Sequence, residues 1–567
     1  MTADIKQLTE QFSVSAQLTA DEVKALADRG IKSLICNRPD GEAADQPNVA
    51  EIDTAASEAG IALAYLPVEP GQFSGKDVSD FLAALQRLPS PVHAFCRTGT
   101  RSTTLWALTQ RRMGADTRDL LEIASAHGYD LSSALRTVDE TTAAHRRAPN
   151  AAHYDILIVG AGAAGIAVAS SLLSRAKNLS VGIIDPAEVH YYQPGWTLVG
   201  AGIFKQRDTV KTMASLIPEG VEWIKAAVGA FEPEHNRVTL EDTRPVYYER
   251  LIVAPGIKLD WHGVEGLVDT LGHNGVTSNY RYDLAPYTWQ LVKTLRTGRA
   301  VFTQPPMPIK CAGAPQKALY LSADHWQRSG VLGNIEIDFY NAGAALFGVK
   351  EYVPALMEYI ERYRARLHFG QRLVKIDGEA KTAWFESVSD DGSTRLCETD
   401  FDMIHVCPPQ CAPDFVRHSV LADAAGWVDV DQNTLQHKRF SNIWGLGDAM
   451  SAPNAKTAAA ARMQAPIVAN NLLEDMGLVQ GVAHYNGYGS CPLTVERGKI
   501  VLAEFGYGGK LLPSFPRWVI NGQRPSRLAW YLKEKILPPV YWMAMLKGKE
   551  WMVDPEQAKA RAESGVE

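Results

Sequence analysis

The sequence lacks several features that would assign it to a class at once. No uninterrupted apolar run approaches the roughly 18 to 20 residues that cross a bilayer. Its 57 basic residues form no cluster and are outnumbered by 64 acidic residues, which argues against a nucleic acid-binding surface. The first residues, MTADIKQLTEQ, include no basic and apolar leader, so we expect a cytoplasmic protein.

Cysteine is scarce, with seven residues in a chain of 567. An odd and sparse set does not form the disulfide framework of a secreted protein. In a cytoplasmic protein, some of these cysteines are better interpreted as redox or catalytic groups. The length of the chain, at an ordinary composition, predicts about three or four domains.

Short apolar strands alternate with amphipathic helices along most of the chain, which predicts an α/β fold. This periodicity is lost at HRRAPNAAH, a stretch with the composition of a linker. We therefore expect a first α/β domain at residues 1–145, a linker at 146–153, a second α/β unit at 154–510 and a tail at 511–567.

A nucleotide-binding loop opens the second unit. The segment DILIVGAGAAGIAVASSLL is typical of a buried strand, a turn with Gly160, Gly162 and Gly165, and an apolar helix. The first glycine permits the turn, the second lets a pyrophosphate approach the backbone, and the third lets helix and strand pack closely. Asp185 follows the next strand and suits a pair of ribose hydroxyls, so we predict a Rossmann-type dinucleotide site.

Two later segments indicate that the dinucleotide is FAD. RLIVAPGI carries Gly256, and NIWGLGDAM carries Gly447 and Asp448. With the first loop, they resemble the three-part FAD pattern of flavoproteins that have two Rossmann-like dinucleotide-binding domains. This resemblance implies that Asp448 holds the ribityl or phosphate region, and that the helix beginning at Lys456 and Thr457 faces the flavin, where its dipole stabilises the reduced ring. The alternative is that Asp448 is a helix cap.

The second nucleotide-binding half is expected between residues 295 and 345, but it lacks a glycine fingerprint. Its loop, PPMPIKCAGAPQK, contains Cys311 and prolines that remove the backbone donors of a phosphate cradle. We therefore expect the NAD(P)H pocket to be lost and electrons to arrive through sulfur chemistry. A flavin-coupled thiol normally works with a second thiol. Spacing alone leaves four partners open, namely Cys397, Cys407, Cys411 and Cys491.

Five segments of this unit carry a family resemblance. They are HYYQPGWTLVGAG, KCAGAPQK, GDA with the later KTAAAA, YGSCPL and YWMAMLKG. Together they resemble the sulfide:quinone oxidoreductase family, in the branch that includes the mitochondrial enzyme, from residue 153 to about 552. The resemblance implies that Cys311 and Cys491 are the redox pair at the flavin. The other three candidates are then structural or incidental.

The resemblance also implies a mechanism. Hydrosulfide attacks the oxidised pair and leaves a persulfide on Cys491 and a thiolate on Cys311. Two electrons reduce FAD and pass to a quinone, and a small thiol or sulfite removes the sulfane sulfur. Lys310 and Lys317 flank the cysteine loop, where cations would favour the thiolate. Solvated surface lysines are the commoner case, and we expect these two to be exposed.

The tail combines aromatic and basic residues, RPSRLAWYLKEKILPPVYWMAMLKGKEWM, and Pro538 and Pro539 are expected to divide it into two short amphipathic helices. An apolar face with a basic rim suits a membrane surface, where a quinone is reached. Packing on the core or on a second copy is the alternative, and a homo-oligomer stays open. The resemblance favours a peripheral position on the inner face of the cytoplasmic membrane. The basic residues are Arg524, Arg527, Lys533, Lys535, Lys547 and Lys549.

The first domain has a strand–loop–helix segment, VHAFCRTGTRSTTLWAL, with Cys96 at the strand end and Arg101 at the helix start. Loop N–H groups aimed at one point bind an anion and lower a thiol pKa. Four residues separate the two, as in rhodanese sulfurtransferases, whereas tyrosine phosphatases have five. The segment expected to carry a phosphatase general acid, YLPVEPGQFS, offers Glu69 but no aspartate.

The whole first domain resembles a family with the fold of dual-specificity phosphatases that also occurs beside sulfur-metabolising hydrolases. NRPDGE, with Arg38 and Asp40, belongs to this resemblance. We favour sulfane-sulfur transfer over hydrolysis of phosphate esters, and we expect Cys36 in the core.

The sequence thus predicts one enzyme in which a sulfide:quinone oxidoreductase unit supplies sulfur to the first domain. The sulfur would pass from Cys491 to Cys96 directly or through glutathione. The alternatives are a phosphatase domain, a type II NADH dehydrogenase-like flavoprotein, and a persulfide-sensing protein that binds partners.

Overall fold

The computed structural model describes residues 4–135 apart from 44, 72, 74, 113, 114 and 133, then residues 152–388, residues 393–550 and residue 553. The chain divides into two compact units. One comprises Met1–Ala151 with Leu473–Gln480, and the other comprises Ala152–Leu472 with Gly481–Glu567. The residues of the predicted tail therefore belong to the second unit. Part of the predicted linker, residues 146–151, lies outside the described residues.

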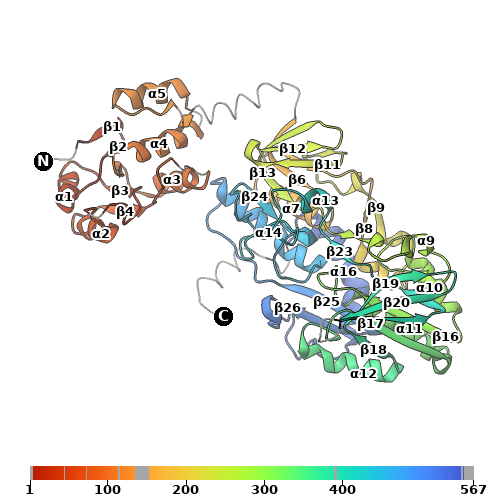
Figure 1. Ribbon diagram of the computed structural model, residues 1–567. Coiled ribbons are helices and arrows are strands. Elements are labelled where there is room, and N and C mark those ends of the chain that lie inside the picture. Colours follow the sequence, from red (N-terminus) through yellow and green to blue (C-terminus); the bar gives the residue numbers. More distant parts are fainter. Residues whose placement is uncertain are drawn as a thin grey trace. The chain divides into compact units, whose positions relative to one another are not determined.

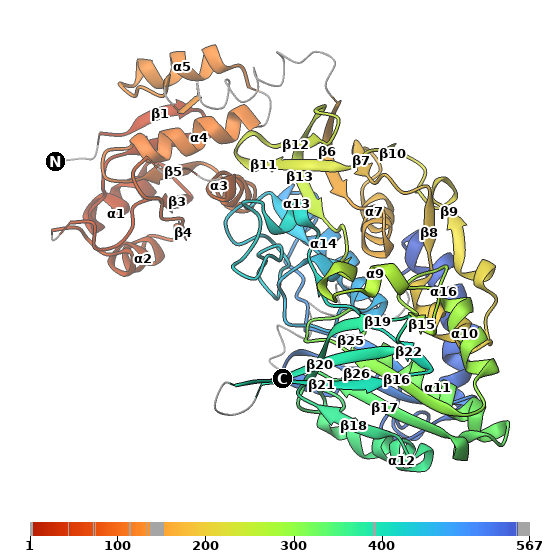
Figure 2. The same cartoon turned by 45° about the vertical axis from the view of Figure 1, so that its right-hand side comes forward.

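The first unit is a five-stranded sheet covered by helices (Figures 1 and 2). Its strands are β1 (Lys6–Thr9), β2 (Phe12–Ser15), β3 (Ser33–Cys36), β4 (Ala62–Tyr65) and β5 (Val92–Phe95), in the order β1-β2-β5-β3-β4. Its helices are α1 (Ala20–Asp28), α2 (Val49–Glu58), α3 (Gly75–Arg87), α4 (Thr100–Arg112) and α5 (Thr117–Ala126). All neighbouring strands are parallel except β1 and β2.

Alternating side chains divide the core of this unit into two layers. Leu34, Cys36 and Phe95 pack against α1 and α2, whereas Ile35 and Ala94 pack with α3, α4 and α5. A parallel sheet covered on both faces needs strands that are apolar throughout, and every residue of β3 and β5 is buried. Because β3 and β5 are parallel neighbours, the loops that leave their carboxyl ends meet at one edge of the sheet.

The second unit begins with a Rossmann-type sheet. Its strands are β6 (Ala152–Val159), β7 (Val181–Ile184), β10 (Val221–Ile224), β11 (Val228–Glu232), β12 (Arg237–Leu240), β13 (Pro245–Val253) and β24 (Ile443–Gly445). The order is β10-β7-β6-β13-β12-β11, with β24 paired to β13. Helix α7 (Ala163–Arg175) follows β6. Since β6, β7, β13 and β24 run parallel, the segments that follow them, at residues 160, 185, 254 and 446, lie at one edge.

A second sheet of this unit is parallel throughout, in the order β15-β22-β16-β17-β18. Its strands are β15 (Val276–Thr277), β16 (Gly298–Gln304), β17 (Ile335–Asn341), β18 (Arg366–Phe369) and β22 (Met403–His405). Beside it lies an antiparallel sheet of β19 (Gln371–Asp377), β20 (Thr382–Val388) and β21 (Thr394–Asp400). The shorter elements are β8 (Val189–Tyr191), β9 (Val210–Thr212), β14 (Lys258–Leu259), β23 (Gln410–Cys411), α8 (Trp196–Val199), α9 (Leu267–Thr270), α10 (Ala285–Thr294) and α13 (Asp414–Arg417).

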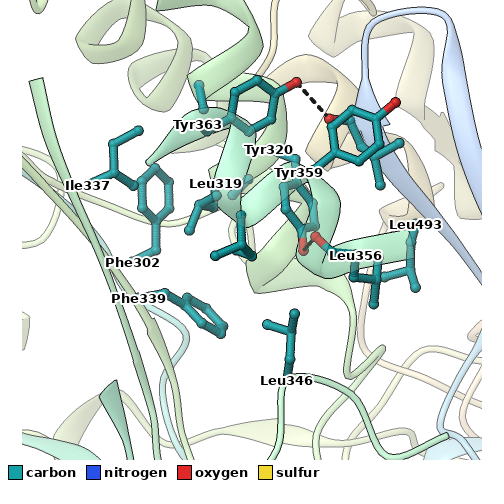
Figure 3. Close-up of a cluster of buried hydrophobic side chains, with 14 of the residues drawn as sticks. Phe302, Leu319, Tyr320, Ile337, Phe339, Leu346, Leu356, Tyr359, Tyr363 and Leu493 are labelled. Atoms are coloured by element: carbon teal, nitrogen blue, oxygen red, sulfur yellow. Dashed lines mark hydrogen bonds between the residues drawn. The ribbon is translucent and has the colours of Figure 1, made fainter. Parts of the chain in front are cut away.

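Aromatic side chains fill the core between this sheet and its helices (Figure 3). Phe302 and Phe339 come from β16 and β17, Tyr320 from α11 (Ala314–Arg328), and Tyr363 from α12 (Val353–Tyr363). The Tyr363 hydroxyl donates a 3.0 Å hydrogen bond to a carbonyl of the hairpin formed by β25 (Gly489–Glu496) and β26 (Lys499–Phe505). This core fixes the hairpin against α11.

The tail helix is continuous where the sequence predicted a division. Helix α15 (Arg527–Tyr531) passes through a π-helical turn, Leu532–Ile536, into α16 (Leu537–Met543). Pro538 and Pro539 lie in the first turn of α16, directly after the π-helical turn, and do not end the helix. Among the residues that the structure describes, no helix is both long enough and apolar enough to span a membrane.

Candidate active site

The glycine-rich loop after β6 is shaped by close contacts. Gly160 has φ +99°, and a Cβ there would lie 2.5 Å from the Ala254 carbonyl oxygen. A Cβ at Gly165 would lie 1.8 Å from the Gly160 carbonyl oxygen, so α7 can approach β6 only without a side chain. A Cβ at Gly162 would contact nothing within 4 Å. The loop therefore packs closely against the protein at Gly160 and Gly165 and is open at Gly162, where α7 begins.

A cavity of about 1810 Å³ starts at this loop. It is larger than the roughly 300 to 1,000 Å³ of ordinary ligand pockets, so it can hold a dinucleotide together with a second ligand. The predicted residues that line it are Gly162, Asp185, Gly256, Cys311, Gly447, Asp448, Lys456 and Thr457.

Asp185 lies at the end of β7 with both carboxylate oxygens in use. They accept hydrogen bonds from the backbone N–H groups of Ala161 at 2.7 Å and Ala187 at 2.8 Å. Burial raises the pKa of this carboxyl above its usual range. The two bonds orient the carboxylate beside the glycine loop, at the cavity wall.

The opposite wall is formed by the segment after β24 and by helix α14 (Ala458–Asp475). The Thr457 hydroxyl accepts from the Ala460 N–H at 3.1 Å, so Thr457 caps α14 and Asp448 does not. Lys456 donates to the carbonyl oxygens of Asp448 and Met450 at 2.7 and 3.0 Å. Burial lowers the pKa of Lys456 to about 8. The first turn of α14 thus faces the cavity with its positive dipole end.

Cys311 lines the cavity, and Cys491, which does not itself line it, lies beside Cys311 although the two are 180 residues apart in the sequence. Their sulfur atoms are separated by 3.4 Å. Cys311 lies in the loop between β16 and α11 and has φ +55°. Its N–H donates to the Lys456 carbonyl at 2.8 Å, which fixes the cysteine loop to the segment before α14. Cys491 is on β25 and is almost fully buried.

The other candidate cysteines lie elsewhere in the unit. Cys397 is on β21 and Cys411 is on β23. Cys407 is buried beside Tyr280, and burial raises its pKa to about 12. The structure therefore brings together the pair that the family resemblance implied, which spacing alone had not distinguished.

Lys317 corrects the expectation of a solvated lysine. It lies on α11 with 3% of its surface exposed, and its Nζ donates to Cys311 Sγ at 3.1 Å. The hydrogen bond from Cys491 and the charge of Lys317 hold the pKa of Cys311 well below its usual range. The same hydrogen bond, with burial, raises the pKa of Cys491. In the reduced pair, the negative charge is therefore on Cys311 and the proton is on Cys491.

Two further lysines surround this site. Lys310 is partly exposed, donates to Gln193 Oε1 at 2.6 Å and lies 3.4 Å from the Asp448 carboxylate. Lys533, which the sequence placed in the basic rim of the tail, is 4% exposed and points inward. Its Nζ donates to the Pro194 carbonyl at 3.2 Å. Burial and the charge of Lys317 lower the pKa of Lys533 to about 8.

The first unit has a separate candidate site at the carboxyl ends of β3 and β5. Cys96 follows β5 directly, is fully buried, and its sulfur accepts the Gly99 N–H at 3.2 Å. Arg101 is the second residue of α4 and is 6% exposed. Its Nη1 donates to the Val68 carbonyl at 2.8 Å, and its Nη2 donates to Glu42 at 2.9 Å. Asp40, noted in the sequence, accepts instead from the Val49 N–H at the start of α2.

Comparison with known proteins assigns both units. Residues 4–113 match the family described as beta-lactamase hydrolase-like protein, phosphatase-like domain, and residues 154–301 match pyridine nucleotide-disulphide oxidoreductase. The mitochondrial sulfide:quinone oxidoreductase of Dictyostelium discoideum is 42% identical over 398 residues, which cover 70% of this chain and 86% of that protein. The chain belongs to the sulfide:quinone oxidoreductase family.

Other matches agree with this assignment. The crystal structure of the sulfide:quinone oxidoreductase from Aquifex aeolicus shares the fold, with a TM-score of 0.59 and 18% identity over 73% of this chain and 96% of that chain. The first unit is similar to the beta-lactamase hydrolase-like protein of Agrobacterium fabrum, with 31% identity over 139 residues. Those residues span about a third of that relative, 32% of its length.

The family membership confirms the predicted α/β fold and shows an FAD-dependent oxidoreductase with an N-terminal phosphatase-like domain. It favours this function over the NADH dehydrogenase and sensor alternatives. The residues present fit FAD, because the loop at Gly162 is open to the cavity and two helices begin at its walls.

Sequence reasoning missed two residues of these sites. Lys533 was counted as one charge among six, and its helical segment gave no indication of which charges face inward. Glu42 stands in the quoted segment NRPDGE, but only Arg38 and Asp40 were selected from it. Glu42, whose side chain is 15% exposed, lies two residues after Asp40 and belongs to no recognisable sequence pattern, so its pairing with Arg101 is visible only in the structure.

Proposed function

We propose that the second unit oxidises hydrosulfide at the Cys311–Cys491 pair and delivers the electrons through FAD to a quinone. The observation that carries this proposal is the 3.4 Å approach of the two sulfur atoms, with the ammonium group of Lys317 against one of them. Such a pair can close to a disulfide, and only one of its two sulfurs is stabilised as a leaving thiolate.

Hydrosulfide attacks Cys491 Sγ of the oxidised pair. A bond forms between the hydrosulfide sulfur and Cys491 Sγ, and the Cys311–Cys491 disulfide bond breaks. The products are a hydropersulfide on Cys491 and a thiolate on Cys311. Lys317 stabilises that thiolate, which makes Cys311 the better leaving group. FAD, when bound, accepts two electrons and transfers them to the quinone. A small thiol or sulfite takes the outer sulfur from Cys491, and the pair closes again as its two electrons leave.

Anaerobic titration of the holoenzyme with sulfide tests this function. Sulfide is expected to bleach the flavin absorbance, and Cys311→Ser and Cys491→Ser are expected to abolish the bleaching. NADH in place of sulfide serves as the comparison. Bleaching by NADH but not by sulfide would refute the proposal.

We propose that the first unit accepts sulfane sulfur on Cys96, either from Cys491 directly or through a small thiol such as glutathione. The short Cys96–Arg101 spacing and the Gly99 N–H directed at the sulfur support a cysteine nucleophile that receives sulfur. Cys96→Ser is expected to leave quinone reduction with cyanide or sulfite as acceptor nearly unchanged. A collapse of that activity would contradict the separation of the two reactions.

We propose that the region 511–550 contacts the inner face of the cytoplasmic membrane, where a quinone is available. Large apolar side chains are exposed there, including Trp518 at 87%, Met543 at 60% and Tyr531 at 55%. Exposed aromatic and apolar groups beside basic residues favour a membrane interface. Trp518→Ser with Met543→Ser is expected to weaken binding to anionic vesicles in a flotation assay. Undiminished binding would assign the contact to another surface.

A further inference from the structure

The guanidinium group of Arg101 already has an anionic partner inside the first unit. Its Nη2 lies 2.8 Å from one Glu42 oxygen and donates to the other at 2.9 Å. Arg38 Nε donates to the same carboxylate at 2.7 Å. The side chains of Arg38, Arg101 and Glu42 are 6%, 8% and 15% exposed. One carboxylate thus stands between two buried arginines at the edge of the sheet that carries Cys96.

This arrangement changes what the Cys96 loop can bind. Each terminal nitrogen of Arg101 donates within the protein, Nη1 to the Val68 carbonyl and Nη2 to Glu42. A bidentate phosphate or sulfate needs that same fork of donors. The hydrogen bond from Arg101 holds the pKa of Glu42 below its usual range, so the carboxylate stays ionised at neutral pH. A dianion entering the loop would meet an occupied guanidinium and a fixed negative charge.

We propose that Glu42 restricts the Cys96 site to donors whose reacting sulfur is uncharged, namely hydropersulfides, and excludes dianions such as phosphate esters and thiosulfate. The inference rests on the proposed sulfur transfer to Cys96 and names its substrate class. Glu42 acts through Arg101 and is a specificity-determining residue, not a catalytic one.

The transfer itself needs no added oxidant. The Cys96 thiolate attacks the outer sulfur of R–S–SH, a sulfur–sulfur bond forms to Cys96, and the original sulfur–sulfur bond breaks. The proton stays on the outer sulfur, and the products are Cys96–S–SH and the thiolate R–S⁻. The Gly99 N–H, 3.2 Å from Cys96 Sγ, stabilises the attacking thiolate. A neutral donor places no second charge beside Glu42.

The test compares donors on the full-length holoenzyme, with the sulfur on the Cys96 peptide measured by mass spectrometry. The donors are 2-hydroxyethyl hydropersulfide and thiosulfate. The variant is Glu42→Gln, which keeps the size of the side chain and removes its charge. Glu122→Gln is the matched control, because Glu122 is an exposed acid on α5.

In the wild type we expect sulfur transfer from the hydropersulfide to be at least about tenfold faster than from thiosulfate. E42Q is expected to raise the thiosulfate rate by at least about tenfold and to make the reaction sensitive to inorganic phosphate. The hydropersulfide rate is expected to change little in E42Q, and E122Q is expected to match the wild type with both donors.

The outcomes separate the inference from the function on which it rests. If the ratio of the hydropersulfide rate to the thiosulfate rate is the same in E42Q and the wild type, the role of Glu42 is overturned while sulfur transfer to Cys96 stands. No sulfur on Cys96 from either donor in any variant would overturn the transfer function and the inference with it. If E42Q does not fold, the rates of the wild type with the two donors test the proposal. A thiosulfate rate equal to or above the hydropersulfide rate would then contradict it.

Discussion

At the scale of single residues, the reactive pair is made unequal by its neighbours. Cys491 is buried and Cys311 is half-buried, and the hydrogen bond from Cys491 and the charge of Lys317 place the thiolate charge on Cys311. A symmetrical pair would release either sulfur, whereas in the proposed reaction this pair releases Cys311 and retains the transferred sulfur on Cys491. The direction of the proposed reaction therefore depends on the buried ammonium group of Lys317, together with the hydrogen bond from Cys491.

Lys317→Met tests this asymmetry. Removing the cation raises the pKa of Cys311, so the thiolate is formed only at higher pH. We expect flavin reduction by sulfide to slow by about 10- to 100-fold near neutral pH and its pH profile to move to the alkaline side. Stopped-flow absorbance across pH 6 to about 9.5 measures both effects. Lys350→Met, at an exposed lysine, is the control, and an unmoved profile in K317M would contradict the assignment.

Lys533→Met tests the second buried lysine through stability. Burial lowers its pKa to about 8 from 10.5, so the folded protein binds this proton less tightly than the unfolded chain does. Below pH 8 the charged side chain therefore reduces the free energy of unfolding by about 3 kcal/mol. That penalty disappears as the pH rises from 8 to 10.5. We expect K533M to be the more stable protein at pH 7 and to lose this advantage near pH 10.5.

Thermal unfolding at several pH values measures the difference. Lys535→Met provides the control, because Lys535 is two residues away and largely exposed. A constant difference between K533M and the wild type at all pH values would show that Lys533 titrates normally.

At the scale of secondary structure, the glycine loop and the hairpin illustrate what the sequence could and could not predict. The loop after β6 was predicted with its three glycines because its chemistry is local, and each glycine has a contact or an opening that explains it. The hairpin that carries Cys491 contacts a loop 180 residues earlier in the chain through the two cysteine sulfurs, and no local sequence pattern predicts that contact. Only the family resemblance selected Cys491.

The tail shows the same limit in another form. Its composition predicted helices with a basic rim, and the helices are present. The prolines were expected to divide them, but both lie in the first turn of α16, directly after the π-helical turn, and the helix continues through them. The number of basic residues in the tail does not show which of them is buried. The buried face of a helix depends on the surface that it packs against, so the position of Lys533 near the cysteine pair could not be predicted.

Gly165→Ala tests the packing of α7 on β6. The added methyl group would lie 1.8 Å from the Gly160 carbonyl oxygen, and the helix would have to move away from the loop. Overpacking of this kind costs about 1–3 kcal/mol or more, and the displaced loop would no longer fit a pyrophosphate. We expect G165A to lose most of its bound flavin, measured as flavin absorbance per polypeptide. Gly333→Ala, where an added Cβ meets nothing within 4 Å, is expected to retain it.

At the scale of the whole molecule, two units with separate cores carry two thiol sites. The sulfide:quinone oxidoreductase relative aligns with 70% of this chain but with 86% of its own length. Most of that relative therefore has a counterpart in this chain. The first unit, which matches a different family, adds a candidate cysteine site.

Removal of residues 1–135 tests this independence. We expect the shortened protein to bind FAD and to reduce quinone with sulfide at a rate within about twofold of the full chain, because a compact unit keeps its own core. Sulfite as the acceptor makes the measurement independent of Cys96. Loss of flavin binding in the shortened protein would show that the first unit is needed to fold the second.

The separation of Cys311 and Cys491 along the sequence has a consequence for thermal unfolding. A bond between Cys311 and Cys491 closes a covalent ring of about 180 residues, and restricting the unfolded chain in this way is worth about 5 kcal/mol in the chain-entropy treatment. In the proposed reaction, hydrosulfide opens that ring. Calorimetric scans of oxidised and sulfide-treated protein should therefore differ in melting temperature, so that turnover could be followed with no optical signal from the cofactor.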